Sequence, residues 1–180
     1  MRYPSHGKSC FCFLVVMLCL LSGFSSAVSL ELMSNDFNNR GQIPQKYTGL
    51  GEDISPELCW AGVPDGTKSF VVILDDPDAP VGNWVHWVIY NISSSSRILK
   101  RGIVKNGTLS DGTCQGRNSF GKIGYNGPYP PHGPAHRYVF TLYALDSVPN
   151  IKEGADKVKI LNTIKSHILA QTELMGWYKQ

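Results

Sequence analysis

The sequence predicts a mainly antiparallel β domain that carries one packed C-terminal helix. Three apolar runs, residues 69–74, 84–92 and 136–145, have the length and composition of strands, and turn-forming segments separate them. Only one segment, which follows Asp156, carries apolar residues at helical spacing. Several strands and a single late helix indicate a sheet that the helix covers on one face.

The elements of the first half follow a simple order. Residues 28–33 alternate weakly between apolar and polar side chains and are expected to open a sheet, whereas residues 34–57 are rich in turn formers and are expected to be loop. The turn Pro64-Asp65-Gly66-Thr67 precedes the strand at 69–74. An acidic turn stiffened by proline, Asp75-Asp76-Pro77-Asp78-Ala79-Pro80, then leads into the strand at 84–92.

The second half is predicted to hold a long loop, a strand and the helix. Residues 116–133 are rich in glycine and proline and are expected to form a structured loop before the strand at 136–145. Asp156 is expected to cap the helix, because apolar residues recur behind it at three- and four-residue spacing and a glycine follows as a stop signal. These residues are Val158, Leu161, Ile164 and Ile168, with Gly176 as the stop.

The first 27 residues are predicted to be a signal peptide and not part of the fold. Arg2 and Lys8 supply a positive beginning, and residues 11–21 form an apolar run that is too short to span a bilayer. Small residues at 25–27 predict cleavage before Val28, the alternative being an uncleaved N-terminal anchor. We therefore expect an exported protein, periplasmic or secreted, without stable membrane insertion.

The mature chain, residues 28–180, has the size of a single domain with its own core. Loss of Arg2 and Lys8 leaves 15 basic and 14 acidic residues, a net charge of +1. A nearly neutral domain without a basic stripe argues against nucleic acid as a partner.

Cysteine use divides in the same way. Three of the five cysteines lie in the signal segment, and Cys59 and Cys114 remain. In an oxidising compartment these two could form a disulfide, while two separate buried thiols are the alternative. The sequence leaves both open, because it does not give the separation that a bridge requires.

The candidate site follows from side-chain direction. Alternation along a strand places His136 and Tyr138 on one face. His86 lies in a strand that is apolar on both faces, and a histidine there is usually a core residue. Alternation also puts Val85, Trp87 and Ile89 on one side of that strand and Val88 on the other.

If Asp76, His86, His136 and Tyr138 converge, they form a small polar pocket walled by tryptophan and proline. Protonated imidazoles donate hydrogen bonds to an anion, and an aspartate can hold an imidazole in its donor tautomer.

Other functions remain open at this point. Asp76, His86 and His136 could form an open three-ligand zinc site, and an aspartate–histidine pair could serve a hydrolase. The sequence contains neither a Gly-x-Ser-x-Gly nor an HExxH element. A macromolecular inhibitor of a protease or kinase, acting through the surface around the pocket, is the other alternative.

Several motifs, in order, resemble the phosphatidylethanolamine-binding protein family, in its bacterial Raf-kinase-inhibitor-like (YbhB/YbcL-type) branch. The resemblance covers nearly the whole mature chain, although bacterial relatives often have cysteine at the position of Tyr129. The matching motifs are Ile54-Ser55-Pro56-Glu57-Leu58, Gly66-Thr67-Lys68-Ser69, Asp75-Asp76-Pro77-Asp78-Ala79-Pro80, Trp84-Val85-His86-Trp87, Gln115-Gly116-Arg117-Asn118, Gly127-Pro128-Tyr129-Pro130-Pro131 and His136-Arg137-Tyr138.

The resemblance implies a large antiparallel sheet packed on a smaller one, and a pocket at one sheet end that accepts phosphate or a phospho-headgroup. No cofactor, metal or catalytic residue is expected there, and Arg137 should point away from the pocket. A protein partner is unidentified and the oligomeric state is open, a homodimer being one candidate. The ligand-binding residues carried over by motif or placed in the wall are Asp76, Asp78, Trp84, His86, Gly127, Tyr129, Pro130, Pro131, His136 and Tyr138.

Overall fold

The structure, a computed structural model, describes residues 29–180, so the predicted signal peptide at 1–27 and its cleavage before Val28 lie outside the described residues. Across residues 29–180, no helix has both the length and the apolar character needed to cross a membrane. The elements in chain order are β1 (Glu31–Met33), β2 (Gly41–Gln42), the 3-10 helix η1 (Gln45–Tyr47), β3 (Leu58–Ala61), β4 (Ser69–Asp76), β5 (Trp84–Ser93), β6 (Ile98–Leu99), β7 (Cys114–Gln115), β8 (His136–Leu145), α1 (Lys157–Ile164) and β9 (Ile168–Tyr178).

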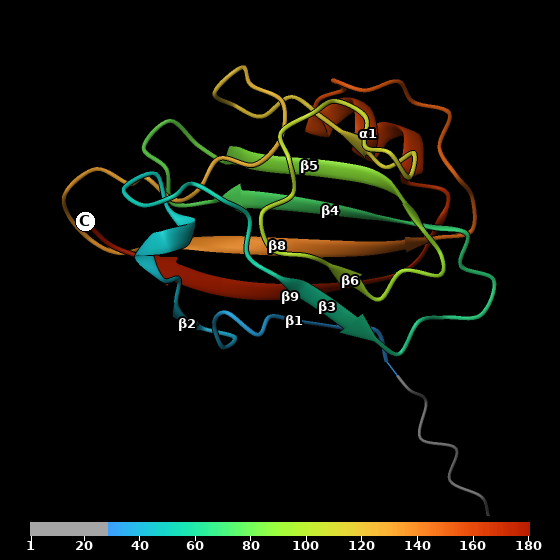
Figure 1. Cartoon of the computed structure of the whole chain (residues 1–180), viewed down its shortest axis with the longest axis horizontal. Coiled ribbons are helices and arrows are strands. Elements are labelled where there is room, and N and C mark those ends of the chain that lie inside the picture. The colour runs from blue at the N-terminus through green and yellow to red at the C-terminus, as the bar shows by residue number, and fades with distance from the viewer. Residues whose placement is uncertain (1–28) are drawn as a thin grey trace, which may run out of the picture.

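Two sheets form the frame of the domain, which confirms the predicted fold class. The large sheet has the strand order β2-β9-β8-β4-β5-β7, and the small sheet has the order β1-β3-β6. All pairings are antiparallel except the short one between β2 and β9. Figure 1 shows β3 and β6 of the small sheet crossing one side of the large sheet, with α1 on the side near β5.

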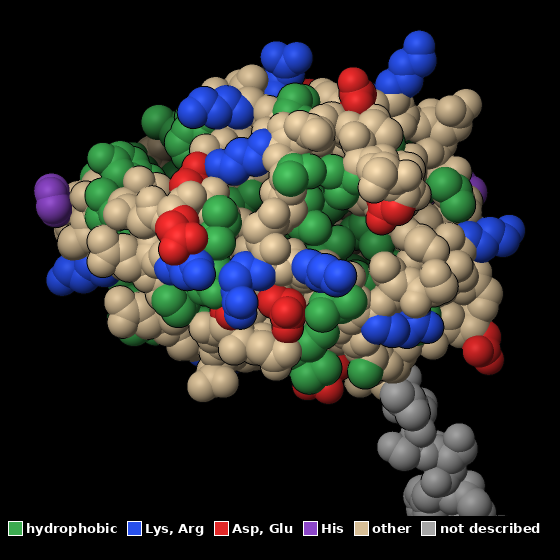
Figure 2. All heavy atoms as spheres, in the orientation of Figure 1, with side chains coloured by type: hydrophobic (Ala, Val, Ile, Leu, Met, Phe, Trp, Pro, Cys, Tyr) green, Lys and Arg blue, Asp and Glu red, His purple; other side chains and the backbone are tan. Residues whose placement is uncertain are grey.

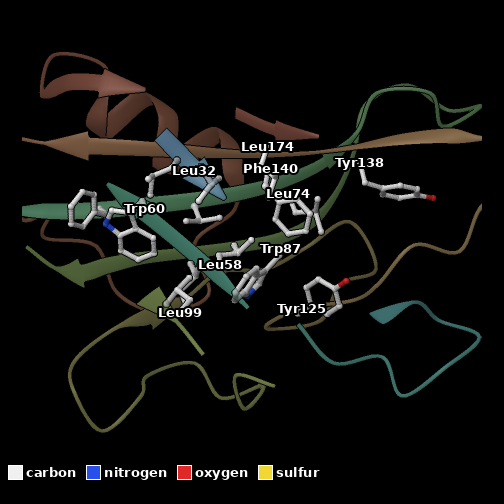
Figure 3. Close-up of a cluster of buried hydrophobic side chains, with 14 of the residues drawn as sticks. Leu32, Leu58, Trp60, Leu74, Trp87, Leu99, Tyr125, Tyr138, Phe140 and Leu174 are labelled. Atoms are coloured by element: carbon white, nitrogen blue, oxygen red, sulfur yellow. The ribbon is translucent and has the colours of Figure 1, made fainter. Parts of the chain in front are cut away.

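The main core lies between the two sheets. Leu58 and Trp60 of β3 meet the inward-facing side chains of the large sheet, among them Leu74, Trp87 and Phe140 (Figure 3). All of these are buried, and full burial of one such side chain is worth roughly 1.5–3 kcal/mol. Along β4 and β5 these side chains alternate with apolar ones that point to the opposite face, because both faces of these strands are buried.

A second core joins α1 to the opposite face of the large sheet. Ile160 and Ile164 of the helix pack there against Val71, Ile73 and Val88. The helix begins where predicted, because the Asp156 carboxylate accepts the backbone N–H of Lys159 at 2.8 Å. The prediction that the helix covers one sheet face is confirmed.

The predicted extent of the helix is wrong. It ends at Ile164, and Ile168, which was counted among its apolar positions, opens the long strand β9. β9 pairs with β8 along its whole length. Gly176 lies within this strand and does not stop a helix. Glycine is needed there because a Cβ would collide with the Ile43 side chain.

Both described cysteines are free thiols, so the disulfide considered above is not formed. Cys114 is buried in the core beneath α1, on one face of the large sheet. Cys59 belongs to the small sheet across the other face and points away from the inward side chains of β3. The large sheet therefore separates the two sulfurs.

The predicted loop at 116–133 contains no helix or strand, and one asparagine organises it. The Asn118 amide donates to the Gly124 carbonyl at 2.9 Å and to the Asn126 side chain at 2.8 Å. Its oxygen accepts the backbone N–H groups of Phe120 and Lys122. The loop is thereby fixed against the end of the large sheet, with Phe120 and Asn126 in set positions.

Candidate functional site

A pocket of about 270 Å³ lies at one end of the large sheet, where β4 ends and β5 and β8 begin. In Figure 1 this is the end at which β9 finishes and the acidic loop after β4 turns back. Its lining, taken from residues 29–180, contains two histidines and no lysine or arginine. The lining residues are Asp76, Ala79, Pro80, Val81, Trp84, His86, Phe120, Tyr129, Pro130, Pro131 and His136.

Asp76 holds the first histidine. His136 Nδ1 lies 2.8 Å from Asp76 Oδ2, and both side chains are almost completely buried. The other oxygen, Oδ1, accepts the backbone N–H of Asp78 at 2.9 Å. Both carboxylate oxygens are thus occupied within the protein, and Nδ1–H of His136 is fixed as a donor. The remaining nitrogen, Nε2, is free to meet a ligand.

The second histidine is held by the backbone. His86 Nδ1 donates to the Asn126 carbonyl at 2.8 Å, and the Asn126 N–H donates to the His86 carbonyl at 3.0 Å. Burial is the main reason why the pKa of His86 is lowered from its ordinary value of 6.5. The ring is therefore neutral at pH 7 and carries the lone pair on Nε2, which accepts a hydrogen bond.

A β-bulge turns His86 into the pocket. Leu74 pairs with Trp87, but Asp75 pairs with Val85, so that His86 is the extra residue of β5. Regular alternation had placed Val85 on the Trp87 side, and this expectation is wrong: Val85 packs on the α1 face. His86 instead shares the opposite face with Tyr138, its ring centroid 5.2 Å from the tyrosine ring.

Aromatic side chains form one wall of the pocket. Phe120 packs edge-on against Trp84 and His86, with ring centroids 5.4 and 5.3 Å away. Tyr129 stands at the mouth with 57% of its surface exposed. The sequence analysis missed Phe120, because no spacing rule or strand pattern links it to the histidines, and only the Asn118 turn brings it there.

Tyr138 lies behind the two imidazoles and does not line the pocket. As predicted, it shares a strand face with His136, and both are buried while Arg137 between them is exposed. Its hydroxyl is buried and has no hydrogen-bond partner within residues 29–180. Burial, and then the negative charge of Asp76, raise the pKa of Tyr138 far above its usual range. The phenol therefore remains a protonated donor.

Two further predicted residues support the pocket and do not line it. The Asp78 carboxylate accepts from the Arg137 backbone N–H, Nε and Nη2 at 2.7–2.9 Å, which fastens the acidic loop to β8. These contacts lower the pKa of Asp78 from 3.8 to about 2. Gly127 is a point of close approach, since a Cβ there would collide with the Tyr47 carbonyl.

The structure thus brings seven of the ten predicted residues to the pocket wall. They are Asp76, Trp84, His86, Tyr129, Pro130, Pro131 and His136. Ala79, Pro80 and Val81 were not predicted as lining residues, although the first two belong to the acidic turn from which Asp76 was identified.

A metal site finds no support in this geometry. Over residues 29–180, no group of three or more His, Cys, Asp or Glu side chains is arranged to hold a metal ion.

Comparison with known proteins gives a consistent result. Residues 33–179 match the family described as phosphatidylethanolamine-binding protein. A UPF0098 protein of Methanothermobacter thermautotrophicus is 47% identical over 151 residues, which are 84% of this chain and 99% of the relative. The UPF0098 protein YbhB of Escherichia coli is 40% identical over 157 residues, 83% of this chain and 99% of the relative.

Solved structures agree with these sequence matches. A chain from Chlamydia trachomatis, described as a phosphatidylethanolamine-binding protein homologue, superposes with a TM-score of 0.78 at 39% identity, covering 85% of this chain and 99% of the other. YbcL of Escherichia coli, described as a new member of the mammalian PEBP family, has a TM-score of 0.78 at 32% identity. The superposition covers 84% of this chain and 99% of YbcL.

Proposed function

Because the chain belongs to the phosphatidylethanolamine-binding protein family, we propose that it binds a small phosphate-bearing molecule, free or as a phospholipid headgroup, in the histidine pocket. The observation that carries the proposal is the pair of imidazoles, His86 and His136. Each ring is fixed by a hydrogen bond at Nδ1, and both rings line the same small pocket, where Nε2 is available to a ligand.

The chemistry of the pocket suits free phosphate or a phosphomonoester that still carries a proton, whereas a phosphodiester headgroup has no P–OH group and would accept hydrogen bonds from protonated imidazoles. Neutral His86 accepts a hydrogen bond at Nε2, which a P–OH group can donate. His136 in its protonated state donates from Nε2 while Asp76 holds Nδ1, and charge-assisted hydrogen bonds of this kind are the strong ones. The apolar wall of Trp84 and Phe120 leaves room for the carbon part of a headgroup.

The proposed activity is binding without turnover. Within the described residues, the lining contains no serine, threonine, cysteine or lysine, but its histidines are potential nucleophiles toward phosphorus, so phosphate release has to be measured. A ligand with so few atoms should bind weakly, with Kd values from about 1 mM to tens of micromolar, or about 4–6 kcal/mol.

Calorimetric titration with phosphate and with phosphoethanolamine tests the proposal. Alanine at His86 or His136 is expected to weaken binding at least about tenfold, since each removes one of the two ligand-facing nitrogens. His132→Ala is the matched control, because His132 is exposed in the same part of the chain and does not line the pocket. Unchanged affinity in both pocket variants would overturn the assignment, and phosphate release from phosphoethanolamine would mean an enzyme.

An inhibitory protein, directed at a protease or kinase, is the second candidate. The observation that favours it is the apolar rim of the pocket, where Val81 is 77% exposed, Tyr129 57% and Phe120 40%. Figure 2 shows hydrophobic side chains gathered at this end of the molecule. Inhibition assays with Val81→Ser and Tyr129→Ser test this role, because both substitutions remove rim surface and keep both histidines.

We also propose that the protein is exported. The support is the charged, apolar and small-residue order of residues 1–27, which is typical of a cleaved signal. Fractionation of cells that express the full chain tests the proposal.

A further inference from the structure

His86, the second pocket histidine, is linked to the Asp53 carboxylate through a single peptide group. Asp53 Oδ1 accepts the backbone N–H of Gly127 at 2.6 Å. The carbonyl of that same peptide group belongs to Asn126 and accepts Nδ1–H of His86 at 2.8 Å. A continuous chain of hydrogen bonds therefore runs from the Asp53 carboxylate through one peptide to the imidazole.

Such a chain changes the acceptor. A peptide whose N–H donates to an anion becomes more polarised, and its carbonyl oxygen becomes a stronger acceptor. A stronger acceptor at Nδ1 keeps the proton on that nitrogen, directs Nε2 to the pocket, and favours the charged form of the ring. Asp53 Oδ2 also accepts from the Asn126 side-chain amide at 3.2 Å. The carboxylate therefore binds both this side chain and the Gly127 N–H.

The backbone at Asp53 sets the direction of its side chain. Its φ is +53°, in the left-handed region that aspartate and asparagine adopt more readily than most other residues. In this conformation the carboxylate reaches the Asn126–Gly127 peptide. Lys105 Nζ, 2.6 Å from Asp53 Oδ2, balances the charge from the outer side.

We propose that Asp53 is a positioning residue for His86, and that it acts through the Asn126–Gly127 peptide to fix the ring and stabilise its protonated form. The pocket then has two carboxylate-supported histidines, His136 supported directly by Asp76 and His86 supported through one peptide. This role rests on the proposed function, because it concerns the same pocket.

Other charged and titratable groups near His86 are left unchanged by the substitutions that test this role. Asp75 and Asp76 lie at the end of β4, and their charges favour the protonated ring. His136 and Tyr138 face it from β8. Lys105, behind Asp53, is itself one of the substituted residues.

Histidine ring ¹⁵N spectra of the ligand-free protein, recorded across pH, test the proposal. Asp53→Asn should lower the titration midpoint of His86 by at least about 0.3 pH units, because it removes a nearby negative charge. Lys105→Met should raise the midpoint, because it leaves that charge unbalanced. At pH 6 the Asp53→Asn protein should bind sulfate about twofold more weakly. A midpoint that is lower by about 0.3 pH units halves the fraction of protonated His86, and sulfate binds that form.

One control accompanies these variants. Glu52→Gln removes a neighbouring charge that pairs with Lys46 outside the network, and it should leave His86 unchanged. Where His86 remains neutral over the whole pH range, its Nδ1 resonance at pH 7 is the readout, since that resonance reports the hydrogen bond to Asn126.

The proposal is wrong if His86 keeps its midpoint and its Nδ1 resonance in both variants, or if both variants shift it in the same direction. Asparagine adopts positive φ readily, so Asp53→Asn preserves the backbone. Should that protein not fold, Lys105→Met decides alone. These spectra need no ligand, so this role can fail while phosphate binding stands, and the reverse.

Discussion

Asp76 Oδ2 and His136 Nδ1 lie 2.8 Å apart, although sixty positions of sequence separate the two residues. The contact joins the end of β4 to the beginning of β8, adjacent strands of the large sheet. Since the pair is almost entirely buried, removal of one partner leaves the other without an acceptor or donor in a dry environment.

Asp76→Ala should therefore destabilise the protein by about 2–4 kcal/mol, because Nδ1 of His136 and the Asp78 N–H both lose their acceptor. Phosphate binding should weaken at least about fivefold as the His136 ring loses its fixed orientation. Urea denaturation and calorimetric titration measure the two effects.

Asp75→Ala is the matched control for this change. Asp75 directly precedes Asp76 in the same strand but faces α1, where it accepts from Lys157 Nζ at 2.7 Å. It should lower stability by about 1 kcal/mol and leave phosphate affinity unchanged. Tighter phosphate binding in Asp76→Ala would contradict the orienting role and would mean that Asp76 mainly repels the ligand.

Sulfate affinity should rise as the pH falls from 8 to 6. Histidine has a reference pKa of about 6.5, and protonated imidazoles attract an anion. Burial lowers the pKa of His86, so the affinity should continue to rise below pH 6. Sulfate is preferable to phosphate, whose own charge changes in this range. A flat titration from pH 8 to 5 would mean that neutral donors, such as backbone amides, bind the anion.

The Asp78–Arg137 contact should contribute stability that depends on pH. The pKa of Asp78 is 3.8 ordinarily and about 2 in the fold, so the contribution is complete above about pH 4 and disappears as the pH falls through 2. Asp78→Asn should lower the melting temperature at pH 7 by no more than about 2–4 °C, since the pair is partly exposed. Melting curves of variant and parent should converge at pH 2, and a constant difference would exclude this linkage.

The mature protein isolated from its native compartment should begin at Val28 and carry two free thiols. The first part follows from the signal-like residues 1–27, and the second from the positions of Cys59 and Cys114 on different sides of the large sheet. Intact-mass analysis after thiol labelling checks both. A product that retains Met1, or one without labelled thiols, would contradict the corresponding half.

The strands were predictable because their signals are local. The predicted runs at 69–74, 84–92 and 136–145 lie within β4, β5 and β8. β9 was not predicted, because Ile168 fits a helical spacing and the partner that makes it a strand is β8, more than twenty residues earlier in the chain. Long-range pairing overrides local propensity there.

Part of the pocket was predictable from the residues. The acidic turn indicated Asp76, and alternation correctly placed His136 and Tyr138 on one face of their strand. The orientation of His86 depends on a register shift between β4 and β5, and such a shift leaves no mark in a single sequence. The contribution of Asp53 depends on one peptide of a distant loop, which alternation rules do not describe.

The place of β9 in the sheet has a consequence for how the protein is made. β8, which begins with His136, lies between β4 and β9, so a nascent chain that ends before residue 168 leaves one edge of β8 bare. The ribosome must release residues 168–178 before the sheet can close, and pairings between such distant segments form slowly. On the export route proposed above, this order would leave the sheet open and the pocket unformed until residues 168–178 have been synthesised.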